Sequence, residues 1–231
     1  MIKFGDVSSE LQKNNLEDTN AYKEIKPQEA ISKETADDYW NNFFENEIET
    51  PEFDDDLLFS VFDRSEDEFD FDFELSDDII ELLRKIKGSE WAYLDDAEKA
   101  NAIETLSDKI SELLGLNECP DISYYDADKN DCGVYNQATH SIELNRSLLN
   151  DPDELIDTIA HELRHAFQHQ KAMAPESALD MLYRVNFDNY ISPLPLGDGK
   201  FLFFADYQDQ LVEVEARAFA KQFSRDEQNK S

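Results

Sequence analysis

Apolar residues recur at helical spacing in four segments of this chain. The first two are residues 77–87 and 95–114, and Gly115 directly follows the second, where helices commonly end. The pattern therefore predicts two helices, each with one face packed on a core. The apolar stripe of the second consists of Ile103, Leu106, Ile110, Leu113 and Leu114.

A third helix is predicted to begin near residue 150. Asn150 or Asp151 can cap its first turn, and Pro152 suits the first helical position. The next two residues are acidic and favour the positive end of the helix dipole. A fourth helix is predicted over residues 207–220. The apolar positions are Leu155, Ile156, Ile159, Leu163, Ala166 and Phe167 in the third helix, and Val212, Ala216, Phe219 and Phe223 in the fourth.

Two short strands are predicted before the third helix, at Asp121–Ala127 and Val134–Asn145. Between the third and fourth helices we expect an irregular stretch, including a Pro- and Gly-rich loop at residues 192–200. Residues 201–205 form a short strand or a loop. These elements predict an α+β domain.

The chain has 231 residues and a formal net charge of −33, with a pI of about 4.2. This charge argues against binding nucleic acid or an anionic membrane through a basic surface. Between residues 34 and 78 there are nineteen acidic residues and one basic residue, Arg64. Aromatic residues are scattered through the same segment, which favours a segment that folds against a partner or against the protein's own cleft. These aromatics are Tyr39, Trp40, Phe43, Phe44, Phe53, Phe59, Phe62, Phe69, Phe71 and Phe73.

We therefore expect three parts. Residues 1–76 form an acidic region with short helices, for example near 35–48, residues 77–225 form the folded domain, and residues 226–231 form a frayed tail. The N-terminal residues lack the apolar core of a secretory signal, and no apolar run approaches the roughly 20 residues of a membrane span. We expect a cytoplasmic protein, with non-classical secretion left open. Cys119 and Cys132 could face each other across a hairpin, but reduced thiols are favoured.

The third predicted helix contains the motif His-Glu-x-x-His, as His161, Glu162 and His165. Histidines four residues apart lie on the same face of a helix, so both can bind one zinc ion (Zn²⁺). The adjacent glutamate is then close enough to activate a water molecule at the metal. Short motifs also occur by chance, and the plainer interpretation is two ordinary histidines on a helix.

A zinc site of this kind needs a third protein ligand, which we expect on the fourth helix. Glu213 and Glu215 are the candidates, and they lie about 200° apart around the helix axis, so both cannot face one metal ion. Small residues one and two turns after Glu213 would allow close approach of the two helices. Geometry alone does not decide between the two glutamates.

The two motifs together resemble those of the gluzincin metallopeptidases. His161-Glu162-x-x-His165 followed by Glu213-x-x-Ala216-x-x-Phe219-Ala220 is especially similar to the pattern in the HtpX and CAAX-prenyl proteases and in the ImmA/IrrE-type peptidases. The resemblance covers about 70 residues. It implies a zincin-like core and Glu213 as third zinc ligand. Those families have Asp or Asn where this chain has Arg217.

Four other residues are candidates for supporting roles. Tyr207 and Tyr190 could stabilise an oxyanion, and we favour Tyr207 as a catalytic residue, although a packed tyrosine is the alternative for each. His169 is interpreted as a surface or supporting histidine, and His140 as a core or rim histidine. The segment 133–145 resembles the edge strand along which such enzymes lay the substrate backbone.

The sequence thus predicts a zinc-dependent metallopeptidase that acts on a protein or peptide. His161, His165 and Glu213 would bind zinc, and Glu162 would be the general base. Three alternatives stay open. The acidic segment 34–78 could inhibit the enzyme by contacting its cleft, the protein could be a catalytically inactive acidic interaction or inhibitor protein with a vestigial site, or the zinc could be structural.

Overall fold

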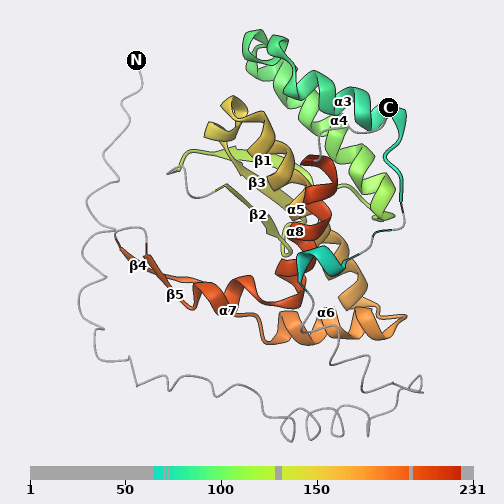
Figure 1. Cartoon of the computed structure of the whole chain (residues 1–231), viewed down its shortest axis with the longest axis vertical. Coiled ribbons are helices and arrows are strands. Elements are labelled where there is room, and N and C mark those ends of the chain that lie inside the picture. The colour runs from blue at the N-terminus through green and yellow to red at the C-terminus, as the bar shows by residue number, and fades with distance from the viewer. Residues whose placement is uncertain (1–64, 70, 72, 128–131, 198–199, 225–231) are drawn as a thin grey trace, which may run out of the picture. The chain divides into compact units, whose positions relative to one another are not determined.

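The computed structural model describes residues 65–69, 71, 73–127, 132–197 and 200–224 (Figure 1). The predictions for residues 1–64, including helices near 35–48, and for the tail 226–231 lie outside the described residues. The described part is α+β and mostly helical, with a small three-stranded sheet and a two-stranded ribbon. Its longer helices are α3 (Asp77–Lys87), α4 (Asp96–Leu114), α5 (Pro152–Met173), α6 (Ala178–Asp188) and α8 (Leu211–Ser224).

Side-chain caps fix the starts of α3, α4 and α5. The side chains of Ser76, Asp95 and Asp151 each accept a hydrogen bond from a backbone N–H three residues later. Gly115 ends α4 in the left-handed conformation, at φ 70°, which a residue without Cβ adopts without strain. The predictions for these helices are confirmed to within one or two residues.

The sheet has the strand order β1-β3-β2 and covers one side of α5 (Figure 1). The strands are β1 (Asp121–Tyr125), β2 (Gly133–Asn136) and β3 (Ser141–Asn145). The prediction of one strand over 134–145 was wrong, because the chain reverses between β2 and β3. Asn136 Oδ1 accepts from the N–H of Ala138, and His140 takes a positive φ of 50°. This turn leaves β2 as an edge strand, antiparallel to β3, while β1 pairs with β3 in parallel.

Helix α6 and the ribbon occupy the stretch that was expected to be irregular. Ser177 and Asp180 form a reciprocal capping box at the start of α6. The predicted loop at 192–200 contains strand β4 (Leu194–Gly197), which pairs with β5 (Lys200–Leu202). The next element is the short helix α7 (Phe204–Gln208). These elements bring the chain back to α8, which lies alongside α5.

The last described part of the acidic region, residues 65–69, 71 and 73–76, packs against α8. The rings of Phe71 and Phe73 contact Phe219 at centroid distances of 5.5 and 5.6 Å. Glu66 forms ion pairs with Arg217, at 2.5 Å, and with Lys221. This part of the aromatic-rich segment therefore folds against its own domain, and the remainder, 34–64, lies outside the described residues. Position 217, where the resembled families have Asp or Asn, thus holds the acidic segment in place.

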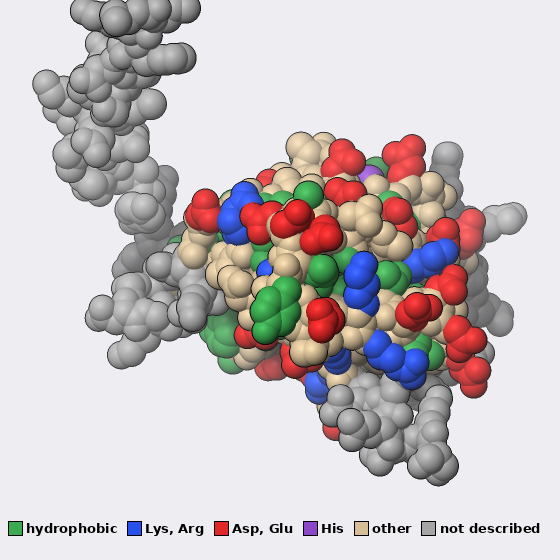
Figure 2. Space-filling view, turned by 90° about the horizontal axis from the view of Figure 1, so that it is seen from above, with side chains coloured by type: hydrophobic (Ala, Val, Ile, Leu, Met, Phe, Trp, Pro, Cys, Tyr) green, Lys and Arg blue, Asp and Glu red, His purple; other side chains and the backbone are tan. Residues whose placement is uncertain are grey.

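Two further expectations concern the whole domain. Among the described residues, no helix combines the length and apolar character needed to cross a membrane. Cys119 and Cys132 are half-buried and are not joined by a disulfide, and the Cys132 thiol contacts Glu154. On the face shown in Figure 2, acidic side chains are spread widely, with lysine and arginine side chains between them.

Candidate metal centre and its pocket

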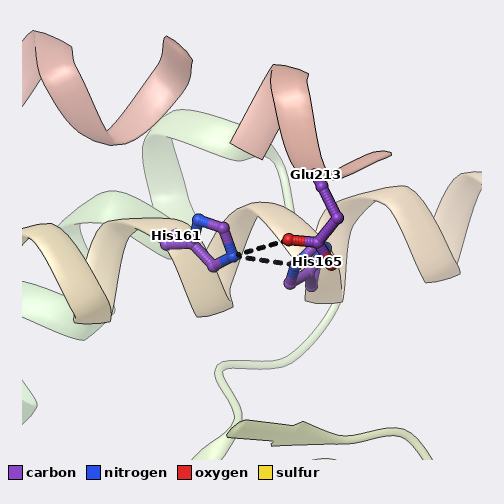
Figure 3. Close-up of side chains that lie close together, drawn as sticks. All are labelled: His161, His165 and Glu213. Atoms are coloured by element: carbon purple, nitrogen blue, oxygen red, sulfur yellow. Dashed lines mark hydrogen bonds and ion pairs between the residues drawn. The ribbon is translucent and has the colours of Figure 1, made fainter. Parts of the chain in front are cut away.

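His161, His165 and Glu213 converge on one point between α5 and α8. The two histidines project from neighbouring turns of α5, and Glu213 approaches from the first turn of α8 (Figure 3). One ligand atom from each residue lies within 4.8 Å of the other two, so this group could hold a metal ion. The structure thus brings together the three residues that the sequence proposed as ligands.

The spacing of the three side chains fits a tetrahedral ion. Donor atoms about 2.0–2.1 Å from a tetrahedral zinc lie about 3.4 Å from one another. His161 Nε2 lies 3.0 Å from His165 Nε2 and 3.5 Å from Glu213 Oε2. His165 Nε2 lies 3.4 Å from Glu213 Oε1. The two carboxylate oxygens each face one histidine, and the three side chains lie close enough together to surround one small cation.

The electrostatics of this group also favour a cation. Glu213 is only 1% exposed, and its buried Oε2 accepts no hydrogen bond from the described residues. Burial alone would raise the pKa of Glu213, but the contacts with His161 and His165 hold it well below its ordinary value. Burial alone would lower the pKa of His165, but Glu213 outweighs this and raises it to about 9. The group therefore attracts positive charge, which a proton can supply in the absence of metal.

Glu215 faces a different set of partners, although it is also on α8. It is 2% exposed, forms an ion pair with Arg164, and accepts hydrogen bonds from the Tyr183 hydroxyl at 2.7 Å and from Gln168 Nε2 at 2.7 Å. Its carboxylate is thus fully engaged away from the histidines. The choice between the two glutamates, which the sequence left open, falls on Glu213 for the metal group.

Glu162 lies in the same pocket and is 8% exposed. Its Oε2 accepts a hydrogen bond of 2.7 Å from the backbone N–H of Tyr135, on the outer edge of β2. The close approach of β2 to α5 requires Gly133, since a Cβ there would lie 2.8 Å from the Thr158 methyl group. The edge strand and the glutamate of the motif are therefore held together by a direct contact.

Two tyrosines lie on the other side of the metal group. The Tyr190 hydroxyl donates a hydrogen bond of 2.5 Å to Glu213 Oε1. Tyr207 lines the pocket, with its ring edge-on to Tyr190 at 6.1 Å. Burial, reinforced by the charge of Glu213, raises the pKa of both hydroxyls above the ordinary value. Both therefore keep their protons at neutral pH and can act as hydrogen-bond donors.

The other two histidines stay outside the ligand group. His169 is half-buried and stacks on Phe187 with ring centroids 3.6 Å apart, and burial lowers its pKa to about 4. His140 contacts the Tyr135 hydroxyl at 2.9 Å and the Glu118 carbonyl at 3.1 Å, as a rim histidine with satisfied ring nitrogens.

The three residues of the metal group, Glu162, the two tyrosines and His169 line a pocket of about 550 Å³. Its wall continues from the metal group along α5 and α6 to the edge strand β2. Among the described residues that line it, none comes from 65–76. The lining residues beyond those already described are Val134, Gln137, Ala172, Met173, Arg184 and Asp188.

Comparisons of this chain with protein-family models, with curated proteins and with solved structures found no match.

Proposed function

We propose that this protein is a zinc-dependent metallopeptidase. The observation that carries the proposal is the convergence of His161, His165 and Glu213 in one pocket that also contains Glu162. Two imidazoles and one carboxylate are a common donor set of catalytic zinc sites, in which a fourth position stays open. The open pocket beside the group favours such a site over a closed structural one. A zincin-like core, as the sequence resemblance implies, belongs to the same proposal.

Zinc bound there would polarise the scissile carbonyl group and lower the pKa of a water molecule. Glu162 would act as the general base and would later deliver the proton to the leaving amine. The N–H of Tyr135 binds Oε2, and Oε1 accepts no hydrogen bond from a described residue. One carboxylate oxygen thus orients the side chain while the other is available for the proton.

Tyr207 is proposed to donate a hydrogen bond to the oxyanion that forms on the substrate. Its hydroxyl lies in the pocket beside Glu213 and Tyr190 and keeps its proton. The substrate is proposed to be a protein or peptide, whose backbone would run beside the edge strand β2.

The test begins with elemental analysis of the purified full chain by mass spectrometry. We expect one zinc per chain in the wild type and a loss of zinc in His161→Ala. Absence of zinc after reconstitution would overturn the proposal and favour a catalytically inactive acidic interaction protein.

Cleavage is tested on a library of quenched fluorescent peptides. Glu162→Gln should retain zinc and lose cleavage, because an amide cannot accept the proton from water. Cleavage by zinc-loaded Glu162→Gln at the wild-type rate would rule out Glu162 as the general base. Tyr207→Phe should lower kcat more than it raises KM.

A further inference from the structure

Gln168 lies one turn after His165 on α5 and is fully buried. Its Nε2 donates hydrogen bonds to the Val212 carbonyl at 3.0 Å and to Glu215 Oε2 at 2.7 Å. Both partners are acceptors only, so the amide cannot be turned over without placing two oxygens against two oxygens. The side-chain carbonyl of Gln168 must therefore face His165.

This orientation decides which nitrogen of His165 keeps its proton when the ring is neutral. Gln168 Oε1 lies 2.8 Å from His165 Nδ1, and a carbonyl oxygen can only accept a hydrogen bond. Nδ1 must then be the protonated nitrogen. Nε2, which lies among the atoms of His161 and Glu213, is left to bind a metal ion.

The carboxylate that orients Gln168 is itself held from the opposite side. Glu215 Oε1 pairs with Arg164 and accepts from Tyr183, while Oε2 is directed at Gln168. Arginine stays charged at all relevant pH values, so Glu215 stays an acceptor. A continuous chain of hydrogen bonds thus runs from Arg164 and Tyr183 through Glu215 and Gln168 to His165.

We infer that Gln168 is a positioning residue of the metal centre, which holds His165 in the orientation and tautomer needed for metal binding and is oriented by Glu215. Its effect on zinc rests on the proposed function, but the hydrogen bond to His165 does not. Partners of this kind commonly contribute 10–100-fold to metal affinity.

The test uses Gln168→Met in the full chain, because methionine has a similar shape and cannot accept the Nδ1–H bond. Gln170→Met is the matched control. Gln170 is on the same helix and also makes two hydrogen bonds, to the Gly115 carbonyl and the Asn117 N–H, away from the metal group. Zinc affinity is measured by competition with a chromophoric chelator. We expect a loss of about 10–100-fold in Gln168→Met and less than about threefold in Gln170→Met.

A second measurement detects the hydrogen bond directly. In protein labelled with ¹⁵N-histidine, the Nδ1–H signal of His165 is identified by its loss in His165→Gln. We expect this proton to be protected from exchange with water in wild type and Gln170→Met, both metal-free and zinc-loaded. It should exchange rapidly in Gln168→Met.

The two measurements separate this inference from the proposed function. If the wild type binds no zinc, the proposed function fails, while a protected Nδ1–H in the metal-free protein still supports the contact with Gln168. If that proton is unprotected in the wild type, or if Gln168→Met binds zinc as tightly as Gln170→Met, the inference is overturned. The wild-type measurement decides the contact even if Gln168→Met fails to fold.

Discussion

Glu213 and Glu215 lie two residues apart on α8, and both are almost completely buried. Their surroundings differ in the partner that balances the negative charge. Glu215 has Arg164, with Tyr183 and Gln168 completing its hydrogen bonds. Glu213 has two histidines, the tyrosines Tyr190 and Tyr207, and an oxygen that accepts no hydrogen bond from the described residues.

The difference lies in whether the partner can lose its charge. Arginine cannot be deprotonated in proteins, so the pair of Arg164 and Glu215 is permanent. A histidine can release its proton, so the positive charge beside Glu213 can be exchanged for a metal ion. One carboxylate therefore stabilises the fold, and its neighbour is suited to reversible binding.

The largest expected effect is on stability, in Glu215→Gln. The substitution leaves the buried Arg164 without a carboxylate and sets an amide NH₂ against the NH₂ of Gln168. We expect the free energy of unfolding of the metal-free protein to fall by about 3–5 kcal/mol in urea titrations. The matched variant Glu213→Gln should lose less, because His165 can become neutral. Equal losses in the two variants would contradict the comparison.

The order of effects should reverse for metal binding. Glu213→Gln replaces an anionic ligand by a neutral one and should weaken zinc binding more than about 100-fold, a loss greater than that expected for a supporting residue. Chelator competition measures this affinity, with the folded state confirmed by circular dichroism. Zinc affinity within tenfold of wild type would exclude Glu213 as a ligand.

The pH dependence of stability should belong to the Glu213 side alone. The pKa of His165 is raised from its ordinary value of 6.5 to about 9, so its protonated form stabilises the metal-free fold. This stabilisation is complete below pH 6.5 and is lost as the pH rises through 9, by at most about 3 kcal/mol. Urea titrations between pH 6 and 10 should show the decline in wild type and a flatter profile in Glu213→Gln. Identical slopes would show that another group is responsible.

The smallest effects are expected from two matched tyrosine variants. Tyr183→Phe removes a hydroxyl from Glu215 and should lower stability by about 1–2 kcal/mol while leaving zinc affinity unchanged. Tyr190→Phe removes a hydroxyl from Glu213 and should weaken zinc binding by up to about tenfold, with less than about 1 kcal/mol of lost stability. Urea titration and chelator competition on both variants test this. A loss of zinc affinity in Tyr183→Phe would contradict the assignment of zinc binding to the Glu213 group alone.

The helices that were predicted from the sequence are those marked by capping residues or by an apolar stripe. The capping residues of α3, α4 and α5 and the apolar stripe of α8 depend only on neighbouring residues. Helix α6 was missed because its buried face includes the polar residues Asp180 and Asn186, which weaken the apolar period. The capping box of Ser177 and Asp180 was the signal that could have found it. The turn before β3 has neither Gly nor Pro, and His140 supplies the positive φ.

The site also has one part that local sequence predicts and one part that depends on residues distant in the chain. The spacing of His161 and His165 is a local property, and their convergence followed from it. The choice of Glu213 depends on how α8 is rotated against α5, and that rotation follows from partners of Glu215 such as Arg164, 51 positions away in the chain. The role of Gln168 was not predicted for the same reason, although its position one turn after His165 is clear from the sequence. A buried arginine inside the motif was the signal that an acid must face it.

Gly133 allows strand β2 to lie close to helix α5 because it has no Cβ atom. A methyl group there would meet Thr158 and force β2 away from α5. Tyr135 lies two residues after Gly133 on β2. Its N–H would then move away from Glu162, which lies on α5. The spacing between β2 and α5, and with it the width of the pocket, is therefore fixed by the backbone at Gly133.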